Sequence, residues 1–250
     1  HDWRSQNRSF VLATVIESGG STPRLNGASL VCDGHTFAGT IGGGAVEKKV
    51  LSECVRLLDS DERTKTINVH LVRDLAMCCG GNMTIFLNKT EASPDLVVFG
   101  AGHIGQALAK LSKETDFTVT VVDERSEWLN AERFGSDISC ADEDPISYAR
   151  SAGISNSTYC LVVTHAHDLD QSIIEKLITQ TNKPSFIGLI GSKGKWARFR
   201  SRLLAKGISE DQLAAVYCPC GLDIGSETPT EIAVSVLAQM IQHYRCGLTS

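Results

Sequence analysis

The chain has 250 residues, of which 42% are hydrophobic, and it carries 24 lysines and arginines against 29 aspartates and glutamates. The resulting net charge of −5 argues against a general attraction to nucleic acid or to an anionic membrane surface. No apolar run reaches the roughly 18 residues of a membrane-spanning helix, and the first residues lack the apolar centre of a signal peptide. We therefore expect a globular, cytoplasmic protein.

Residues 10–90 are expected to form a first, β-rich unit of the α+β type. Runs rich in β-branched and apolar residues predict four strands, and one stretch of helical periodicity predicts a helix. The strands are predicted at 10–18, 28–34, 64–72 and 82–88, and the helix at 47–60. A short polar segment with a proline follows at 89–95. It divides the chain into expected domains of residues 1–92 and 93–250.

From residue 95 onward, apolar strands alternate with helical segments. The strands are predicted at 95–100, 117–123, 159–165 and 186–192. This alternation is typical of a parallel sheet covered by helices on both faces, so we predict a doubly wound, Rossmann-like α/β domain. A last helix is expected to begin at a capping box of Thr228 and Glu231, with Pro229 in its first turn.

A glycine fingerprint follows the strand at 95–100. Gly100, Gly102 and Gly105 have the G-x-G-x-x-G spacing, and Asp123 ends the next strand. Such glycines allow a tight turn and the close approach of a pyrophosphate, while the acidic residue accepts a hydrogen bond from a ribose hydroxyl. The pattern predicts a dinucleotide site, and Arg125 leaves the choice between NAD and NADP open. The alternative is a fold that kept the turn and lost the nucleotide.

Two histidines, His165 and His167, follow the strand at 159–165. Ligands of doubly wound sheets lie beyond the carboxyl ends of the strands, so these histidines should border the same crevice as the glycine loop. Together with Asp168 and Asp170 they could bind a metal ion or transfer protons. The two aspartates equally suit the first turn of a helix.

A basic stretch, residues 193–202, follows the strand at 186–192 into the same crevice. Apolar residues on one helical face favour an ordinary amphipathic helix, namely Trp196, Phe199 and Leu203. The alternative is that Ser192, Lys193 or Lys195 holds a phosphate. His103, inside the glycine loop, is interpreted as a surface residue of the first helical turn, and it stays among the candidate cofactor contacts.

Two glycine-rich loops mark the first unit, at 18–28 and 39–47. In the second loop, Gly42, Gly43 and Gly44 precede a helix that is expected to begin near Ala45. Three glycines at a helix start could cradle an anion, although a pair of sharp β turns explains them equally. Arg24 in the first loop could add a bidentate phosphate contact.

Residues 76–82 read AMCCGGN, with Cys78 and Cys79 adjacent. Neighbouring Cα atoms lie about 3.8 Å apart, below the usual disulfide span of about 4.4–6.8 Å, so a cross-link would be strained. Zinc sites use C-x₂-C spacing with further ligands, which this pair lacks. A presented thiol here would suit a soft metal centre or sulfur exchange. The alternative is two packed cysteines in a β turn.

The nine cysteines are an odd number and too dilute for a disulfide scaffold, so reduced thiols are expected. Four of them lie among apolar residues. We predict that these four are small core side chains: Cys32, Cys54, Cys140 and Cys160.

Taken together, these motifs resemble the XdhC/CoxI family of accessory factors for xanthine dehydrogenase and related molybdenum hydroxylases. The first unit carries GGSTPRLNGA, GTIGGGAVE and MCCGG, and the second carries FGAGHIGQALA, VVDERSEW, THAHDLD, LIGSKGKWARFRSRL and GLDIGSETPTEIAVSVLA. The resemblance covers nearly the whole chain. One departure is Cys220 in CPCG, where an aliphatic residue is expected; Cys218 and Cys220 form either a second thiol site or a plain loop.

The resemblance implies a chaperone rather than a catalyst. Family members bind the molybdenum cofactor (molybdopterin), a pterin dithiolene that carries a phosphate. They help it acquire its terminal sulfur with a cysteine desulfurase, and deliver it to the apoenzyme of a molybdenum hydroxylase. The implied metal contact is Cys79, followed by Gly80 and Gly81, while Arg24 and the loop at 42–44 would receive phosphate or pterin. A shared cavity between the two units and a homodimer are expected.

Two other functions stay open. The first is an NAD(P)-dependent oxidoreductase on the doubly wound domain, with His165 or His167 as the proton donor. The second is a regulatory sensor, in which a nucleotide occupies the fingerprint and nothing reacts. Nicotinamide turnover without a molybdenum enzyme would favour the oxidoreductase, and nucleotide binding that alters pterin affinity would favour the sensor.

Overall fold

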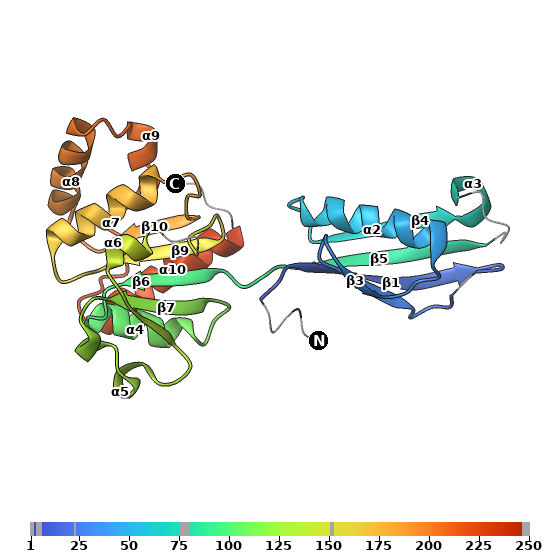
Figure 1. Ribbon diagram of the computed structural model, residues 1–250, viewed down its shortest axis with the longest axis horizontal. Coiled ribbons are helices and arrows are strands. Elements are labelled where there is room, and N and C mark those ends of the chain that lie inside the picture. Colours follow the sequence, from blue (N-terminus) through green and yellow to red (C-terminus); the bar gives the residue numbers. More distant parts are fainter. Residues whose placement is uncertain (1–2, 4–6, 23, 76–80, 151–152, 247–250) are drawn as a thin grey trace. The chain divides into compact units, whose positions relative to one another are not determined.

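The computed structural model describes residues 3, 7–22, 24–75, 81–150 and 153–246. The chain divides into two compact units, His1–Ser93 and Pro94–Ser250 (Figure 1). Each unit has its own hydrophobic core. No helix within the described ranges is both long enough and apolar enough to cross a membrane.

Unit 1 is an antiparallel sheet of five strands in the order β3-β2-β1-β5-β4, with a helix on one face. Its elements are β1 (Phe10–Gly19), β2 (Ser29–Cys32), β3 (Phe37–Gly39), α2 (Gly44–Leu58), β4 (Thr64–His70), α3 (Leu71–Leu75) and β5 (Asn82–Thr90). Alternate residues of β1 point into the core, where Val11, Ala13 and Val15 meet Val46 and Val50 of α2. The four predicted strands and the helix are confirmed, except that the strand predicted at 64–72 ends at His70, after which α3 begins. β3 and α3 were not predicted.

Unit 2 is a parallel sheet of six strands in the order β11-β10-β9-β6-β7-β8. The strands are β6 (Asp95–Phe99), β7 (Thr118–Asp123), β8 (Ser139–Asp142), β9 (Thr158–Val162), β10 (Phe186–Leu189) and β11 (Val216–Tyr217). The strand order reverses between β6 and β9, and ligands of doubly wound sheets bind beyond the carboxyl ends of the strands at such a point. The predicted doubly wound domain is confirmed.

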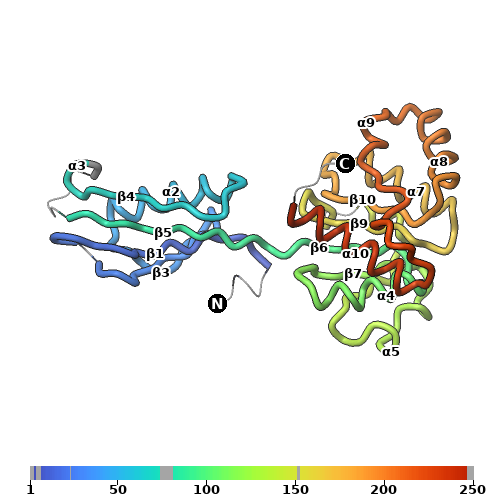
Figure 2. Tube along the Cα trace, turned by 180° about the vertical axis from the view of Figure 1, so that it is seen from behind, coloured from blue at the N-terminus to red at the C-terminus, as the bar shows by residue number. Residues whose placement is uncertain are grey.

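Helices cover both faces of this sheet (Figure 2). They are α4 (His103–Ser112), η1 (Ser126–Trp128), α5 (Ala131–Phe134), α6 (Pro145–Tyr148), α7 (His167–Thr179), α8 (Lys193–Ala205), α9 (Glu210–Leu213) and α10 (Pro229–Cys246). The core on one face is closed by α4 and α10, and the core on the other by α7 and α8. The capping box before α10 is confirmed, because Glu231 N lies 3.3 Å from Thr228 Oγ1 and Thr228 N lies 2.9 Å from Glu231 Oε2.

Three of the four cysteines predicted in the core are buried there, namely Cys32, Cys54 and Cys160. Burial raises the pKa of the Cys54 thiol to about 12. The prediction is wrong for Cys140, whose side chain is exposed. Cys140 lies on β8, an edge strand with a single neighbour, and the residues around it are mostly polar or acidic, so little apolar surface is there to cover it.

Candidate functional site

The glycine-rich segments of unit 1 gather at one end of its sheet, where the end of β1, the start of α2 and α3 lie together (Figure 1). A Cβ on Gly81 would lie 2.6 Å from the carbonyl oxygen of Ser21 and 2.7 Å from that of Gly19. The loop after β1 therefore packs directly on the backbone of Gly81. Cys79 and Gly80 lie outside the described residues, and their expected roles stay predictions.

Arg24 belongs to the same loop, between β1 and β2, and it is exposed. Thr22 Oγ1 donates a hydrogen bond to the carbonyl oxygen of Arg24 at 3.1 Å, and Ser18 Oγ donates to Asn26 Oδ1 at 2.8 Å. These bonds tie the loop to itself on either side of Arg24. An exposed guanidinium on such a loop suits a phosphate, so the role predicted for Arg24 stays open.

At the start of α2, the backbone amides of the glycine loop bind the carboxylate of Glu47. Gly42, Gly43 and Gly44 all have positive φ, at 133°, 73° and 59°. Glu47 Oε2 accepts hydrogen bonds from Gly43 N at 2.7 Å, from Ile41 N at 3.3 Å and from the hydroxyl of Thr40. The loop thus has the geometry of an anion cradle, and the carboxylate of Glu47 occupies it. The predicted phosphate contact at residues 42–44 would require Glu47 to leave.

The glycine loop of unit 2 uses its three glycines for different purposes. Gly100 has a φ of +120°, and a Cβ there would lie 2.4 Å from the carbonyl oxygen of Val163. A Cβ on Gly105 would lie 2.0 Å from the carbonyl oxygen of Gly100, so α4 packs on the turn itself. Around Gly102, by contrast, nothing lies within 4 Å of the Cβ position. Gly102, at the start of α4, therefore leaves open space that fits an approaching phosphate.

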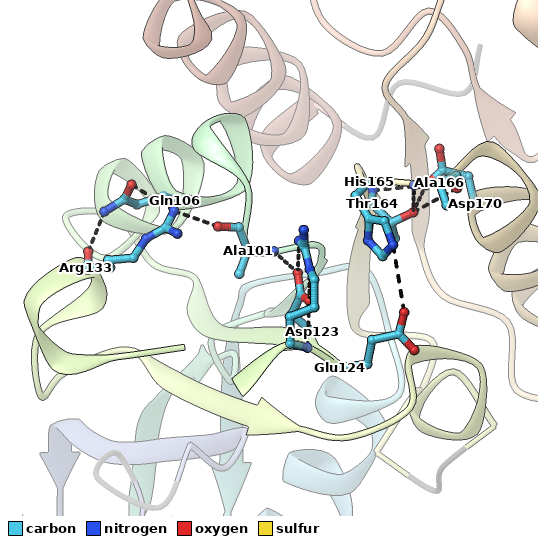
Figure 3. Close-up of polar contacts among 10 residues, drawn as sticks. Ala101, Gln106, Asp123, Glu124, Arg133, Thr164, His165, Ala166 and Asp170 are labelled. Carbon is cyan, nitrogen blue, oxygen red and sulfur yellow. Dashed lines mark hydrogen bonds and ion pairs between the residues drawn. The ribbon is translucent and has the colours of Figure 1, made fainter. Parts of the chain in front are cut away.

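Asp123 is buried at the end of β7 and is bonded to the glycine loop (Figure 3). Its Oδ2 accepts from Ala101 N at 2.7 Å and from Arg125 Nη2 at 2.8 Å, and its Oδ1 accepts from Arg125 N at 3.0 Å and Nε at 2.8 Å. Burial raises the pKa of Asp123, but the hydrogen bonds from Arg125 and Ala101 outweigh it, so the pKa lies below its usual value.

A second arginine holds the other side of the loop. Arg133 Nη2 donates to the carbonyl oxygen of Ala101 at 2.7 Å and lies 3.2 Å from Gln106 Oε1 (Figure 3). The guanidinium carbons of Arg133 and Arg125 lie 4.4 and 4.8 Å from the centre of the Trp128 ring. His103, the exposed first residue of α4, meets Trp128 edge to face. The loop is therefore held rigidly by charged and aromatic side chains that follow β7.

The predicted histidines lie at the same edge of the sheet. His165 Nε2 lies 4.0 Å from Glu124 Oε1, which brings the ends of β9 and β7 together (Figure 3). His167 is the exposed first residue of α7. In the part of the chain that the structure describes, no three His, Cys, Asp or Glu side chains are grouped to hold a metal ion. Ser192 is the N-cap of α8 and accepts from Lys195 N at 3.2 Å.

An ion pair beneath this edge was not predicted. Lys195 Nζ donates to Asp170 Oδ2 at 2.6 Å and to the carbonyl oxygen of Ile190 at 2.9 Å. Asp170 Oδ1 accepts from Thr164 N at 3.0 Å and Thr164 Oγ1 at 2.7 Å. Lys195 is thus buried and paired rather than free for a phosphate, which decides between the two interpretations of this lysine. The network joins the ends of β9 and β10 to the starts of α7 and α8.

The two cysteines after β11 serve packing. Cys220 Sγ would lie 2.6 Å from a Cβ on Gly188, so it covers bare backbone of β10. Cys218 Sγ lies 3.8 Å from the carbonyl oxygen of Gly191. Burial raises the pKa of the Cys218 thiol to about 11 and also raises that of Cys220. Because thiols are poor nucleophiles and ligands while protonated, the geometry favours the plain loop over a second thiol site.

Two family models match the chain. The XdhC and CoxI family matches residues 3–70, and the XdhC Rossmann domain matches residues 96–240, which is more than half of the sequence. The chain belongs to the XdhC/CoxI family. The resemblance that its motifs predicted is confirmed.

Relatives of this XdhC/CoxI chain are longer proteins. The uncharacterized protein YqeB of Escherichia coli K12 is 34% identical over 242 residues, which are 95% of this chain and 44% of YqeB. A protein of Bacillus subtilis 168, described as a probable xanthine dehydrogenase subunit, is 33% identical over 158 residues, which are 63% of this chain and 45% of that protein. The chain spans less than half the length of these curated relatives.

A solved structure shares the fold. A protein described as a xanthine dehydrogenase from Bacillus halodurans matches 99% of this XdhC/CoxI chain and 96% of its own, with a TM-score of 0.57 and 19% sequence identity. At that identity, the likeness shows that the two chains are folded alike.

Proposed function

We propose that the chain is an accessory factor that binds the molybdenum cofactor and delivers it to the apoenzyme of a xanthine dehydrogenase-type molybdenum hydroxylase. Membership of the XdhC/CoxI family across both units carries the proposal. A second support is that one relative is described as a probable xanthine dehydrogenase subunit. The proposed sulfur source is a cysteine desulfurase, and the proposed assembly is a homodimer.

Unit 1 is proposed to hold the metal-bearing part of the cofactor through Cys79. Gly81, the first described residue after the cysteine segment, is anchored, which supports the proposal. Leu71 N donates to the carbonyl oxygen of Gly81 at 3.0 Å, and Gly81 packs against Ser21. Gly81, two residues after Cys79, therefore lies beside the loop that carries Arg24. A thiolate is a soft ligand, and a guanidinium binds phosphate in two-pronged fashion, so the two together suit a phosphorylated metal cofactor.

Unit 2 is proposed to bind a nucleotide at the glycine loop, with NAD(P) as the expected class. The open space at Gly102 and the rigid hold on Ala101 support this assignment, because a phosphate can approach α4 without moving the turn. The residues that border this space are proposed to bind and orient the ligand. No proton transfer by His165 or His167 is part of the proposal.

The test is to express the full chain in a host that makes the molybdenum cofactor and to measure what stays bound through purification. Pterin is quantified by fluorescence after oxidation, and molybdenum by mass spectrometry. Cys79→Ser should lose most of the retained pterin, whereas the neighbouring Cys78→Ser should keep it. Both variants should unfold at the same temperature as the parent chain, which separates lost binding from lost folding.

Equal pterin retention by the parent chain and Cys79→Ser would remove Cys79 from the proposed role. Absence of pterin and molybdenum from all three proteins would overturn the carrier proposal. A nicotinamide assay on the same preparations addresses the oxidoreductase: turnover without an added molybdenum enzyme would replace the carrier with an enzyme.

A further inference from the structure

The carboxylate of Asp123 has no acceptor position left for a ribose. A carboxylate offers about four lone-pair sites on its two oxygens. Here each oxygen accepts two hydrogen bonds, three of them from Arg125 and one from Ala101 N. Recognition of NAD at this position relies on a free carboxylate that accepts from the ribose 2′-hydroxyl. Such a hydroxyl could bond Asp123 only by displacing one of these donors.

Arg125 takes over the place where the ribose is recognised. Its Nε and Nη2 atoms hold Asp123, and the third guanidinium nitrogen, Nη1, takes no part in those bonds. A quarter of the Arg125 side chain is exposed. Stacking on Trp128, 4.8 Å from its ring centre, fixes the plane of the guanidinium. The edge of Arg125 is therefore both accessible and oriented, as a phosphate contact requires.

We propose that the glycine loop of unit 2 prefers nucleotides that carry a 2′-phosphate over those with a free 2′-hydroxyl, and that Arg125 is the specificity-determining residue. This inference rests on the nucleotide site of the proposed function. NADP and its 2′-phosphorylated fragments are the ligand class that it names. Asp123 then acts as a positioning residue, which holds Arg125 on one side and the amide of Ala101 on the other.

Several carboxylates lie near this corner, namely Asp123, Glu124, Glu127 and Asp142, the register partner of Asp123, and their charges oppose a phosphate. Asp123 is neutralised by its two-pronged pair with Arg125. Glu124 lies beside His165, and both it and Glu127 are exposed, so water and salt screen their charges. Arg133, stacked on the same Trp128 ring, supplies a second positive charge. Asp142 is exposed as well. The short-range contacts with Arg125 and Arg133 therefore outweigh the screened repulsion from the solvated carboxylates.

The test is isothermal titration calorimetry of the full chain with NADP⁺, NAD⁺, 2′,5′-ADP and 5′-AMP at low salt. A charge-assisted contact to one phosphate predicts that NADP⁺ and 2′,5′-ADP bind about tenfold or more tightly than NAD⁺ and 5′-AMP. Equal or tighter binding of NAD⁺ would overturn the inference. Binding of none of the four would overturn the nucleotide site as well, and the pterin measurement would still judge the carrier proposal separately.

The variant Arg125→Ala should invert the preference. It removes the phosphate contact, so the affinity for 2′,5′-ADP should fall about tenfold. It also frees one acceptor position on each oxygen of Asp123, since only the bonds from Nε and Nη2 are lost, so a ribose hydroxyl can bind there and the affinity for NAD⁺ should rise. The matched control is Arg198→Ala, which removes an exposed arginine of α8 outside this cluster. If Arg125 had only a structural role, Arg125→Ala would lower the affinities for all four ligands together, and that result would contradict the assignment.

Discussion

Lys195 and Asp170 form a buried ion pair in which only 9% and 1% of the side chains are exposed. Removing one partner leaves the other charged group buried and unpaired, which costs about 3–5 kcal/mol. We expect Lys195→Met to lower the free energy of unfolding of unit 2 by that amount in urea denaturation. The control is Glu210→Gln, which removes an exposed pair with Arg200 and should cost less than about 1 kcal/mol. Similar midpoints for the two variants would contradict the prediction.

The stability of unit 1 should depend on pH in the acidic range because of Glu47. The hydroxyl of Thr40 lowers the pKa of Glu47 most, burial opposes it, and the amides of residues 41–43 assist, so the folded pKa lies below the unfolded value of 4.5. A depressed carboxyl pKa stabilises the fold at neutral pH, and this stabilisation is lost as the pH falls through the folded pKa. Glu47→Gln should remove that part of the acid dependence of the melting temperature. An unchanged acid profile in Glu47→Gln would exclude the effect.

The residues that the sequence did not reveal depend on partners far along the chain. In the sequence Lys195 is one of several cations in a basic stretch. Its buried partner, Asp170, lies 25 positions away. Glu47 reads as an ordinary first-turn residue, because only the fold turns its carboxylate back onto the amide of Gly43. Asp123 and Arg125 are only two positions apart, but their pairing was not predicted, because the sequence assigned Asp123 to a ribose hydroxyl.

At the scale of elements, two glycines of the loop before α4 have different roles, one in binding and one in folding. Gly102→Ala adds a Cβ into open space at a φ of −63°, so unit 2 should fold normally. The added methyl group fills the place of the phosphate, so nucleotide affinity should fall by at least about tenfold. Gly105→Ala puts a Cβ 2.0 Å from a backbone oxygen and should lower the melting temperature of unit 2. Calorimetry and thermal melts on the two variants measure both effects.

If Gly102→Ala bound 2′,5′-ADP as tightly as the parent chain, the phosphate would have to lie elsewhere. If Gly105→Ala melted at the parent temperature, the close contact between α4 and the turn would be wrong. The two variants change the same residue type in the same loop, so each serves as the control for the other.

Most of the strands that the sequence predicted are central and strongly patterned, such as β1 and β6, and the one predicted edge strand, β4, is seven residues long. Those that it did not reveal are β3, β8 and β11, which have three, four and two residues and all lie at sheet edges. An edge strand has one neighbour and needs little apolar pattern, so its local sequence carries a weak signal. The candidate nucleotide loop was predictable because tight turns and close approaches restrict residue choice to glycine.

At the scale of the whole molecule, each hydrophobic core draws its residues from one unit. One core lies between β1 and α2 of unit 1, and the other two cover the faces of the parallel sheet of unit 2. Elements that pack into the same core unfold together, because each loses its buried surface when the others unfold. We therefore expect the two units to unfold in separate transitions, with Trp3 reporting on unit 1 and Trp128 and Trp196 on unit 2.

A nucleotide that binds at Gly102 should then stabilise only one of the two transitions. At 100 times its Kd, a ligand adds about 2.7 kcal/mol to the state that binds it, which corresponds to roughly 5–10 °C for a unit of this size. Differential scanning calorimetry with 2′,5′-ADP should show this shift for the transition of unit 2 alone, and Gly102→Ala should abolish it. A single transition that rises with 2′,5′-ADP would instead mean that the two units unfold as one, because the binding energy then stabilises both units together.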